Sequence, residues 1–223
     1  MSAPDRQAHW QNVYTTKTEK EVSWYQDRPS ISLELIDAAR VGRDAAIVDI
    51  GGGASRLVDA LLEAGYGNLT VLDLSEAALA VSRKRIGPPA ASVKWLTGDV
   101  TTWQPSQQYD VWHDRAAFHF LAEEKDRKAY ISRLKAALRN GWQTIIGTFA
   151  INGPERCSGL PVVRYDAASL AALLGPDFRL LADRVEEHRT PWVHLRFPIQ
   201  QIPVPLTSDQ TPQLMPNVLI FRI

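Results

Sequence analysis

The chain has 223 residues, 45% of them hydrophobic and 22% charged, which fits one globular α/β domain with a large core. Its 25 basic and 25 acidic residues balance, so the overall charge gives no sign of a protein that binds nucleic acid or an anionic membrane. The single cysteine, Cys157, excludes an intramolecular disulfide and a cysteine metal cluster. Because neither an apolar signal core nor a run of roughly 18 apolar residues occurs, we expect a cytoplasmic protein, monomeric or homodimeric, outside the membrane.

Strands and helices are expected to alternate along the first half of the chain. Residues 1–29 are aromatic and polar, and a helix follows Pro29 with Ser30 as its expected N-cap. Ser75 is placed to cap a later helix, which Gly87-Pro88-Pro89 ends. The apolar spacings predict strands at 45–50, 69–73 and 93–96, and helices at 31–39, 55–64 and 75–86.

The second half repeats this alternation as far as residue 187. Asn140-Gly141 is expected to close a charged amphipathic helix, and Asp166 to cap the next helix. The expected strands span 109–113, 142–150 and 178–187, and the expected helices span 123–138 and 167–174. Six prolines between residues 191 and 216 interrupt the C-terminal part, so either 193–197 or 218–223 could complete the sheet.

This order of elements predicts an α/β fold: a doubly wound, mostly parallel seven-stranded sheet with helices on both faces. We expect one domain over residues 1–223, with 1–29 as a lid or substrate segment, 30–150 as the cofactor-binding core, and 151–223 as a substrate loop and C-terminal strands. Ligands of such sheets bind beyond the carboxyl ends of the strands. Polar residues occur at four of these predicted ends, namely Asp49, Asp73, Asp99 and His113.

A glycine-rich turn follows the first predicted strand and opens a helix. Glycine lets backbone N–H groups approach a ligand closely, and the helix adds a positive N-terminus. The dinucleotide fingerprint Gly-x-Gly-x-x-Gly is incomplete, because Arg56 occupies the third glycine position after Gly51 and Gly53. Asp49, just before the turn, is unfavourable beside a diphosphate but suits a cationic ligand. The turn therefore favours a nucleotide-like cofactor other than a dinucleotide.

Four segments together carry a resemblance to a known family. They are Asp49-Ile-Gly-Gly-Gly-Ala-Ser55, Leu72-Asp-Leu-Ser75, Thr97-Gly-Asp-Val100 and Tyr109-Asp-Val-Trp-His-Asp114. Over residues 30–150 the chain resembles the class I, or Rossmann-like, S-adenosylmethionine-dependent methyltransferases. The Gly-x-Gly-x-Ser pattern and the stretch Glu21-Val-Ser-Trp-Tyr25 are similar to the branch of small protein-lysine methyltransferases and uncharacterised bacterial relatives. The resemblance implies in-line methyl transfer from S-adenosylmethionine.

The resemblance also implies a role for each matching residue. Asp73 would accept hydrogen bonds from the ribose hydroxyls, and Asp99 from the adenine amine, beside the backbone N–H of Val100. Gly51 would pass close to the methionine part of the cofactor, and Asp49 would lie near its ammonium group. The expected cofactor-binding residues are Asp49, Gly51, Gly52, Gly53, Ser55, Asp73, Leu74, Asp99, Val100, His113 and Tyr25.

Asp114 and His119 are the expected catalytic residues, since either could take a proton from a nitrogen or oxygen acceptor. Asp114 could equally form an ion pair with Arg115, and His119, between two phenylalanines, could simply be packed. The N-terminal aromatic residues fit either a lid or cation cage over the cofactor, or ordinary packing. They are Trp10, Tyr14, Trp24 and Tyr25. No spacing typical of metal ligands occurs, and Cys157 is expected to be incidental.

The methyl acceptor stays open between a protein lysine and a small molecule with a nucleophilic nitrogen, oxygen or sulfur; a nucleic-acid substrate is not expected. Two alternative functions remain. An NAD(P)-dependent oxidoreductase would use a similar sheet, but the incomplete glycine fingerprint argues against it. A non-catalytic S-adenosylmethionine-binding protein would keep the fold without the reaction.

Overall fold

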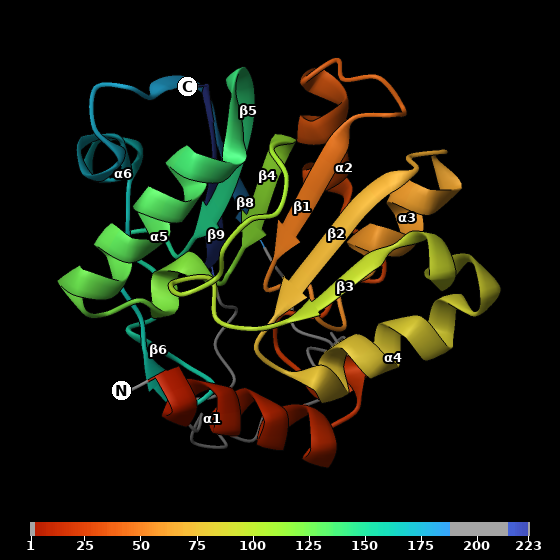
Figure 1. Cartoon of the computed structure of the whole chain (residues 1–223). Helices are drawn as coiled ribbons and strands as arrows, with labels where there is room; N and C mark the ends of the chain where they lie inside the picture. The colour runs from red at the N-terminus through yellow and green to blue at the C-terminus, as the bar shows by residue number, and fades with distance from the viewer. Residues whose placement is uncertain (1–2, 188–213, 223) are drawn as a thin grey trace, which may run out of the picture.

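The computed structural model describes residues 3–187 and 214–222, and its centre is a seven-stranded sheet. The strands run in the order β3-β2-β1-β4-β5-β9-β8 (Figure 1). The parallel strands are β1 (Ala46–Ile50), β2 (Asn68–Asp73), β3 (Lys94–Thr97), β4 (Tyr109–Arg115) and β5 (Leu138–Thr148). β9 (Leu214–Arg222) and β8 (Arg179–Glu187) follow in antiparallel pairing. This mostly parallel sheet confirms the predicted α/β class.

Helices cover both faces of the sheet, as the sequence predicts. On one side they are α2 (Ser30–Ala38), α3 (Leu57–Glu63) and α4 (Glu76–Ile86), and on the other α5 (Glu124–Ala137) and α6 (Ala167–Leu174). Ile47 of β1 belongs to the apolar cluster that includes residues of α2, α3 and α4, whereas its neighbour Val48 belongs to the cluster that includes residues of α5 and α6. Successive side chains of a strand point to opposite faces of the sheet. Every residue of β1 is buried, as expected for a strand covered on both faces.

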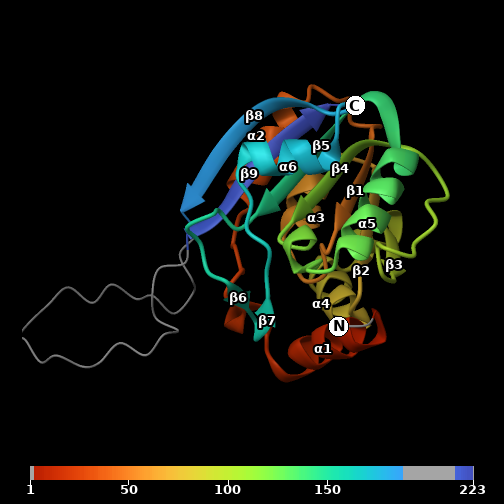
Figure 2. The same ribbon diagram turned by 90° about the vertical axis from the view of Figure 1, so that its left-hand side faces the viewer.

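One helix was not predicted from the sequence: α1 (Ala3–Thr16), which lies across the edge where the parallel strands end. Figures 1 and 2 both show it at the bottom of the molecule, beside α4. Its residues are mostly polar and show no apolar stripe, so periodicity gives no signal. The 3-10 turn η1 (Glu19–Glu21) follows it. The carboxyl edge of the sheet is therefore covered by a segment whose position depends on contacts with the rest of the fold.

The predicted helix caps are confirmed at two positions and wrong at a third. Ser75 Oγ accepts the N–H of Ala78 at 3.1 Å, and Asp166 Oδ1 accepts the N–H of Ser169 at 2.8 Å. Ser30, in contrast, is the first residue of α2, and Pro29 occupies the N-cap position. The reason is that the first helical hydrogen bond is accepted by the Pro29 carbonyl.

Strand β5 begins earlier than predicted. Leu138, the C-cap of α5, already pairs with Tyr109 of β4, and it is 1% exposed and packs in the core. Asn140 and Gly141 therefore lie within β5 instead of closing the helix. The register shifts before Gln143 pairs with Val111, and Gly141 has a positive φ of +83° within this irregular stretch.

The remaining elements are short or lie near the C-terminus. Residues 218–222, one of the two segments expected to complete the sheet, belong to β9, whereas 193–197 lies outside the described residues. The short elements are η2 (Pro88–Ser92), η3 (Phe118–Phe120), β6 (Arg156–Cys157) and β7 (Leu160–Pro161). Among the residues that the structure describes, no helix is long and apolar enough to cross a membrane.

Candidate active site

The carboxyl ends of the parallel strands open into a cavity of about 830 Å³, bounded by α1 and η3. The position of this cavity, next to the reversal of strand order between β1 and β4, is where α/β sheets bind ligands. The predicted cofactor-binding residues that line this larger cavity are Gly51, Asp73, Leu74, Asp99 and Val100.

A smaller hollow of about 520 Å³ adjoins the larger cavity. The predicted residues that line it are Asp49, Gly51, Gly52, Ser55, Tyr25 and His113. The two spaces share Gly51, Tyr14, Trp24 and Arg115, so they meet at the glycine turn. Gly53 lines neither space, and the remaining predicted cofactor-binding residues all border one or both.

Backbone geometry explains why glycines follow β1. Gly51 and Gly53 have positive φ values of +69° and +24°, which residues with side chains disfavour. A Cβ atom on Gly53 would lie 2.6 Å from Oδ2 of Asp73, and one on Gly52 would collide with Oδ2 of Asp49. The turn therefore fits closely around two carboxylates, and a larger residue would displace them.

Asp73 ends β2 and borders the larger cavity although it is only 8% exposed. Its Oδ1 accepts the N–H of Ser75 at 2.7 Å, and the N–H groups of Gly53 and Leu74 also hydrogen-bond to the carboxylate. Burial raises the pKa of Asp73 to about 7, helped by the charge of Asp49 and opposed by the backbone hydrogen bonds. Further donors from a ligand would favour the ionised form of this carboxylate.

Asp49 and His113 form a buried pair behind the glycine turn. Asp49 Oδ1 lies 2.7 Å from Nδ1 of His113, and Nε2 of His113 lies 2.9 Å from the hydroxyl of Ser32. Both ring nitrogens of His113 are therefore engaged with protein groups, although the side chain borders the smaller hollow. Oδ2 of Asp49 has no hydrogen-bond partner among the described residues, so it can accept a donor from a ligand.

Arg6 of α1 also lines the larger cavity, and the sequence analysis missed it. Its guanidinium donates to Asp99 Oδ2 at 2.7 Å and to Asp126 Oδ2 of α5 at 2.6 Å. Burial opposes ionisation of Asp99, but hydrogen bonds from Thr101 and Arg6 outweigh it and lower the pKa. Sequence spacing gives no signal for these pairs, because the acids lie 93 and 120 residues away.

Asp114, predicted as a catalytic residue, hydrogen-bonds to groups of the fold on both of its carboxylate oxygens. Oδ1 accepts the N–H groups of Ala117 and Phe118 at 2.9 and 3.2 Å, and Oδ2 accepts the hydroxyl of Tyr130 at 2.8 Å. The side chain is fully buried and borders neither space. Burial raises the pKa of Asp114 to about 6 against these hydrogen bonds. The carboxylate thus fixes the turn that leads into η3.

His119 of η3 borders the larger cavity but does not fit the predicted role of a general base. Its ring stacks on Phe149 with a centroid distance of 4.6 Å and lies 4.4 Å from the ring of Phe120. Burial, and then the charge of Arg115, lower the pKa of His119 to about 3, so the imidazole is neutral and weakly basic. Burial also raises the pKa of the nearby Cys157 thiol to about 11, which fits an unreactive cysteine.

Aromatic residues of the N-terminal segment form one wall of the larger cavity. Trp10 packs edge-on against Phe120 at 4.9 Å and against Trp24 at 5.5 Å. Trp24 Nε1 donates to the hydroxyl of Tyr14 at 3.0 Å. These aromatic residues therefore pack on one another while lining the cavity, and their role as a lid or cation cage stays a prediction.

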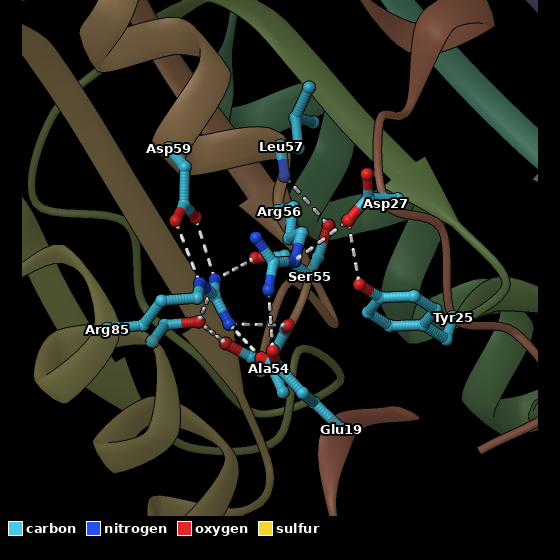
Figure 3. A network of polar contacts seen from close by, with 11 residues as sticks. Glu19, Tyr25, Asp27, Ala54, Ser55, Arg56, Leu57, Asp59 and Arg85 are labelled. Carbon is cyan, nitrogen blue, oxygen red and sulfur yellow. Dashed lines mark hydrogen bonds and ion pairs between the residues drawn. The ribbon is translucent and has the colours of Figure 1, made fainter. Parts of the chain in front are cut away.

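A cluster of charged residues ties the N-terminal segment to the glycine turn (Figure 3). Arg85 of α4 donates to both carboxylate oxygens of Asp59, at 2.8 and 2.7 Å, and also pairs with Glu19 of η1. It further donates to the backbone carbonyls of Ala54 and Ser55, at 3.2 and 2.8 Å. One guanidinium thus connects α4, α3, η1 and the backbone that follows the three glycines.

Tyr25 and Ser55, both predicted cofactor-binding residues, lie beside this cluster (Figure 3). The hydroxyl of Tyr25 donates to Asp27 at 3.0 Å, and its ring lies 5.8 Å from the guanidinium carbon of Arg56. Ser55 Oγ accepts the N–H of Leu57 at 3.1 Å, at the start of α3. Both side chains are held at the rim of the smaller hollow by protein contacts.

Residues 47–141 match the family described as a methyltransferase domain. The matched span contains Asp49, the glycine turn, Asp73, Asp99 and His113, which is most of the predicted cofactor-binding core. The match confirms a methyltransferase domain of the predicted S-adenosylmethionine-dependent class. No curated protein matches the chain in a sequence comparison. Within the described residues, no group of three or more His, Cys, Asp or Glu side chains could hold a metal ion.

Solved structures with a similar fold cover nearly the whole chain. The 1,6-didemethyltoxoflavin-N1-methyltransferase of Burkholderia thailandensis is 20% identical, with a TM-score of 0.69 over 100% of this chain and 90% of that one. A S-adenosylmethionine-dependent methyltransferase of Anabaena variabilis is 13% identical, with a TM-score of 0.70 over 99% and 94% of the two chains. The N-methyltransferase NodS of Bradyrhizobium japonicum is 14% identical, with a TM-score of 0.66 over 95% and 97%. At these identities the likeness is one of fold.

Proposed function

We propose that this S-adenosylmethionine-dependent methyltransferase methylates a small molecule enclosed beneath α1, and not a protein side chain. The observation that carries this proposal is the buried anchoring of α1 over the cavity. The side chains of Arg6, Asp99 and Asp126 are 7%, 9% and 14% exposed, and Gln11 accepts the hydroxyl of Ser75 at 3.0 Å. A protein lysine would have to reach beneath this helix, whereas a small acceptor can be enclosed. In this proposal residues 1–29 are the lid of a single domain, 1–223.

We assign the adenosine end of the cofactor to the larger cavity. Asp73 would accept the ribose hydroxyls, and Asp99 the adenine amine, with Leu74 and Val100 beside the base. The raised pKa of Asp73 supports this assignment, because hydrogen bonds from ribose hydroxyls would stabilise the ionised form of a carboxylate that burial destabilises. The position of Asp73 directly against Gly53 also brings the carboxylate to the turn.

We assign the methionine end to the smaller hollow, beside Gly51, Gly52 and Ser55. The unpartnered Oδ2 of Asp49 supports this assignment, since it can accept a hydrogen bond from the ammonium group. His113 would keep Asp49 in place, and Tyr25 would border the entrance. The reactive methyl group would then lie where the two spaces meet, near Gly51.

When bound, S-adenosylmethionine supplies a methyl group on a positively charged sulfur, so attack by an acceptor lone pair yields the methylated acceptor and a neutral thioether. The chain would contribute alignment and exclusion of water, for which Trp10, Trp24 and Phe120 are placed. His119 is too weakly basic and Asp114 lies outside the cavity. We therefore propose that neither side chain takes the acceptor's proton, which is released to bulk water as the methylated product leaves.

One structural neighbour supports a small acceptor. The Burkholderia thailandensis enzyme is described with 1,6-didemethyltoxoflavin and S-adenosylhomocysteine bound. Its structure aligns with 100% of this chain, including the N-terminal segment that forms α1. A fold similar to that of this chain therefore occurs in an enzyme described with a small molecule and S-adenosylhomocysteine bound.

A methyl-tritium transfer assay tests the choice of acceptor. The purified protein is incubated with tritiated S-adenosylmethionine and cell lysate, and the products are split into protein and small-molecule fractions. We expect radioactivity in the small-molecule fraction, and none above the boiled-enzyme control in protein. Label in the protein fraction alone would refute a small acceptor while leaving methyl transfer intact.

A further inference from the structure

We propose that His119 hydrogen-bonds the methyl acceptor, and that the acceptor is a flat, uncharged heteroaromatic ring with a polar N–H or C=O edge. This inference rests on the proposed function, because it names the class of small molecule that enters the same cavity. In this proposal His119 determines specificity for the acceptor, whereas the sequence predicted that it takes a proton.

The first observation is that His119 has unused hydrogen-bonding capacity. The residue is 0% exposed and borders the larger cavity, yet neither ring nitrogen has a hydrogen-bond partner among the described residues. Most buried polar side-chain atoms in proteins are paired, because leaving them unpaired is costly. A ligand in the cavity can supply the missing partner.

The second observation is the protonation state of the imidazole. Burial and the charge of Arg115 lower the pKa of His119 to about 3, so the ring stays neutral near neutral pH. A neutral imidazole has one N–H donor and one acceptor nitrogen. An acceptor with adjacent N–H and C=O groups can pair with whichever nitrogen faces the cavity.

The third observation is the shape and charge of the surroundings. Phe149 fixes the plane of His119 by stacking at an interplanar angle of 30°, while Phe120, Trp10 and Trp24 line the cavity. Aromatic walls of this kind favour a flat ring. The positive charge of Arg115, which acts on His119, disfavours an ammonium group at this end. An uncharged heteroaromatic ring fits these surroundings better than a lysine or a simple amine.

Binding of 2-hydroxyquinoline tests this inference, because its lactam edge presents N–H and C=O side by side. Isothermal titration is carried out with the full chain saturated with S-adenosylhomocysteine, using His119→Phe, which keeps a flat ring against Phe149. We expect the wild type to bind the probe and His119→Phe to bind it about tenfold more weakly or worse. The control Lys128→Ala lies on the surface, outside both spaces, and should bind the probe like the wild type.

Equal affinity of the wild type and His119→Phe for the probe would overturn the role of His119. Absence of probe binding to a wild-type protein that still binds S-adenosylhomocysteine would overturn the proposed acceptor class alone. Failure to bind S-adenosylhomocysteine would instead overturn the proposed function as well.

An NMR measurement on the wild type avoids dependence on the folding of a variant. The chain has five histidines, so the imidazole resonances of a histidine-labelled sample are few enough to separate. The probe should shift the His119 resonances and leave those of His9 in place. A titration that moves no histidine resonance would contradict a hydrogen bond to His119.

Discussion

At the scale of single residues, Asp73 links burial to cofactor binding. Burial holds its pKa at about 7 in the free protein, whereas ribose hydroxyls would favour the ionised carboxylate. Binding should therefore release a proton, and affinity for S-adenosylhomocysteine should rise up to about tenfold per pH unit below about pH 7, then level off. Isothermal titration between about pH 5.5 and about pH 8 measures this slope.

The control for this prediction is Asp73→Asn, which keeps the shape but cannot ionise, so its weaker binding should not change with pH. An equally steep pH profile in that variant would show that another group is responsible.

The contribution of Asp73 to folding stability changes with pH in the opposite direction to its contribution to cofactor binding. Because the folded pKa is raised above 3.8, the folded chain holds this proton more tightly than the unfolded one. The contribution of Asp73 to stability is therefore lost as pH rises from about 4 to about 7.

At the scale of elements, helix α1 depends on its docking contacts. An isolated helix of its length, 14 residues, is marginal in water, so most of its stability must come from the cavity edge. Arg6→Ala would leave Asp99 and Asp126 buried without their cation, which typically costs about 3 kcal/mol. We expect hydrogen exchange of the α1 amides to accelerate by about a hundredfold, with the core strands nearly unchanged.

The matched control for Arg6→Ala is Lys128→Ala. Lys128 pairs with Glu124 on the surface, where the two side chains are 73% and 69% exposed, so its loss should leave exchange unchanged. Unaltered exchange of α1 in Arg6→Ala would contradict an anchoring role for the buried pairs. Equal acceleration in the core strands would mean that the variant loosens the whole fold instead.

The elements differ in how much of them the sequence could predict. The helices capped by Ser75 and Asp166 follow from local capping chemistry, which acts over three residues and is visible in the sequence. Helix α1 has no such signal, because Arg6 finds its partners through the fold. The start of β5 was misplaced for a related reason: burial of Leu138 in the core overrides the turn tendency of Asn140-Gly141.

At the scale of the whole molecule, the sequence predicts the sheet and the edge at which the site lies. Parallel strands bring Asp49, Asp73 and Asp99 to one edge whatever the loops do, so their convergence follows from topology. The roles of Asp114 and His119 depend on which way each side chain turns. Asp114 accepts hydrogen bonds from the next turn, and His119 borders the cavity with neither ring nitrogen hydrogen-bonded to any residue that the structure describes.

Isothermal titration of the wild-type protein with S-adenosylhomocysteine, and separately with NAD, most directly tests whether this cavity holds a methyl donor. We predict one S-adenosylhomocysteine site per chain, no heat of binding with NAD, and loss of binding in Asp73→Ala with its circular dichroism spectrum unchanged. Tight binding of NAD without a response to S-adenosylhomocysteine would contradict the assignment of the cavity to S-adenosylmethionine.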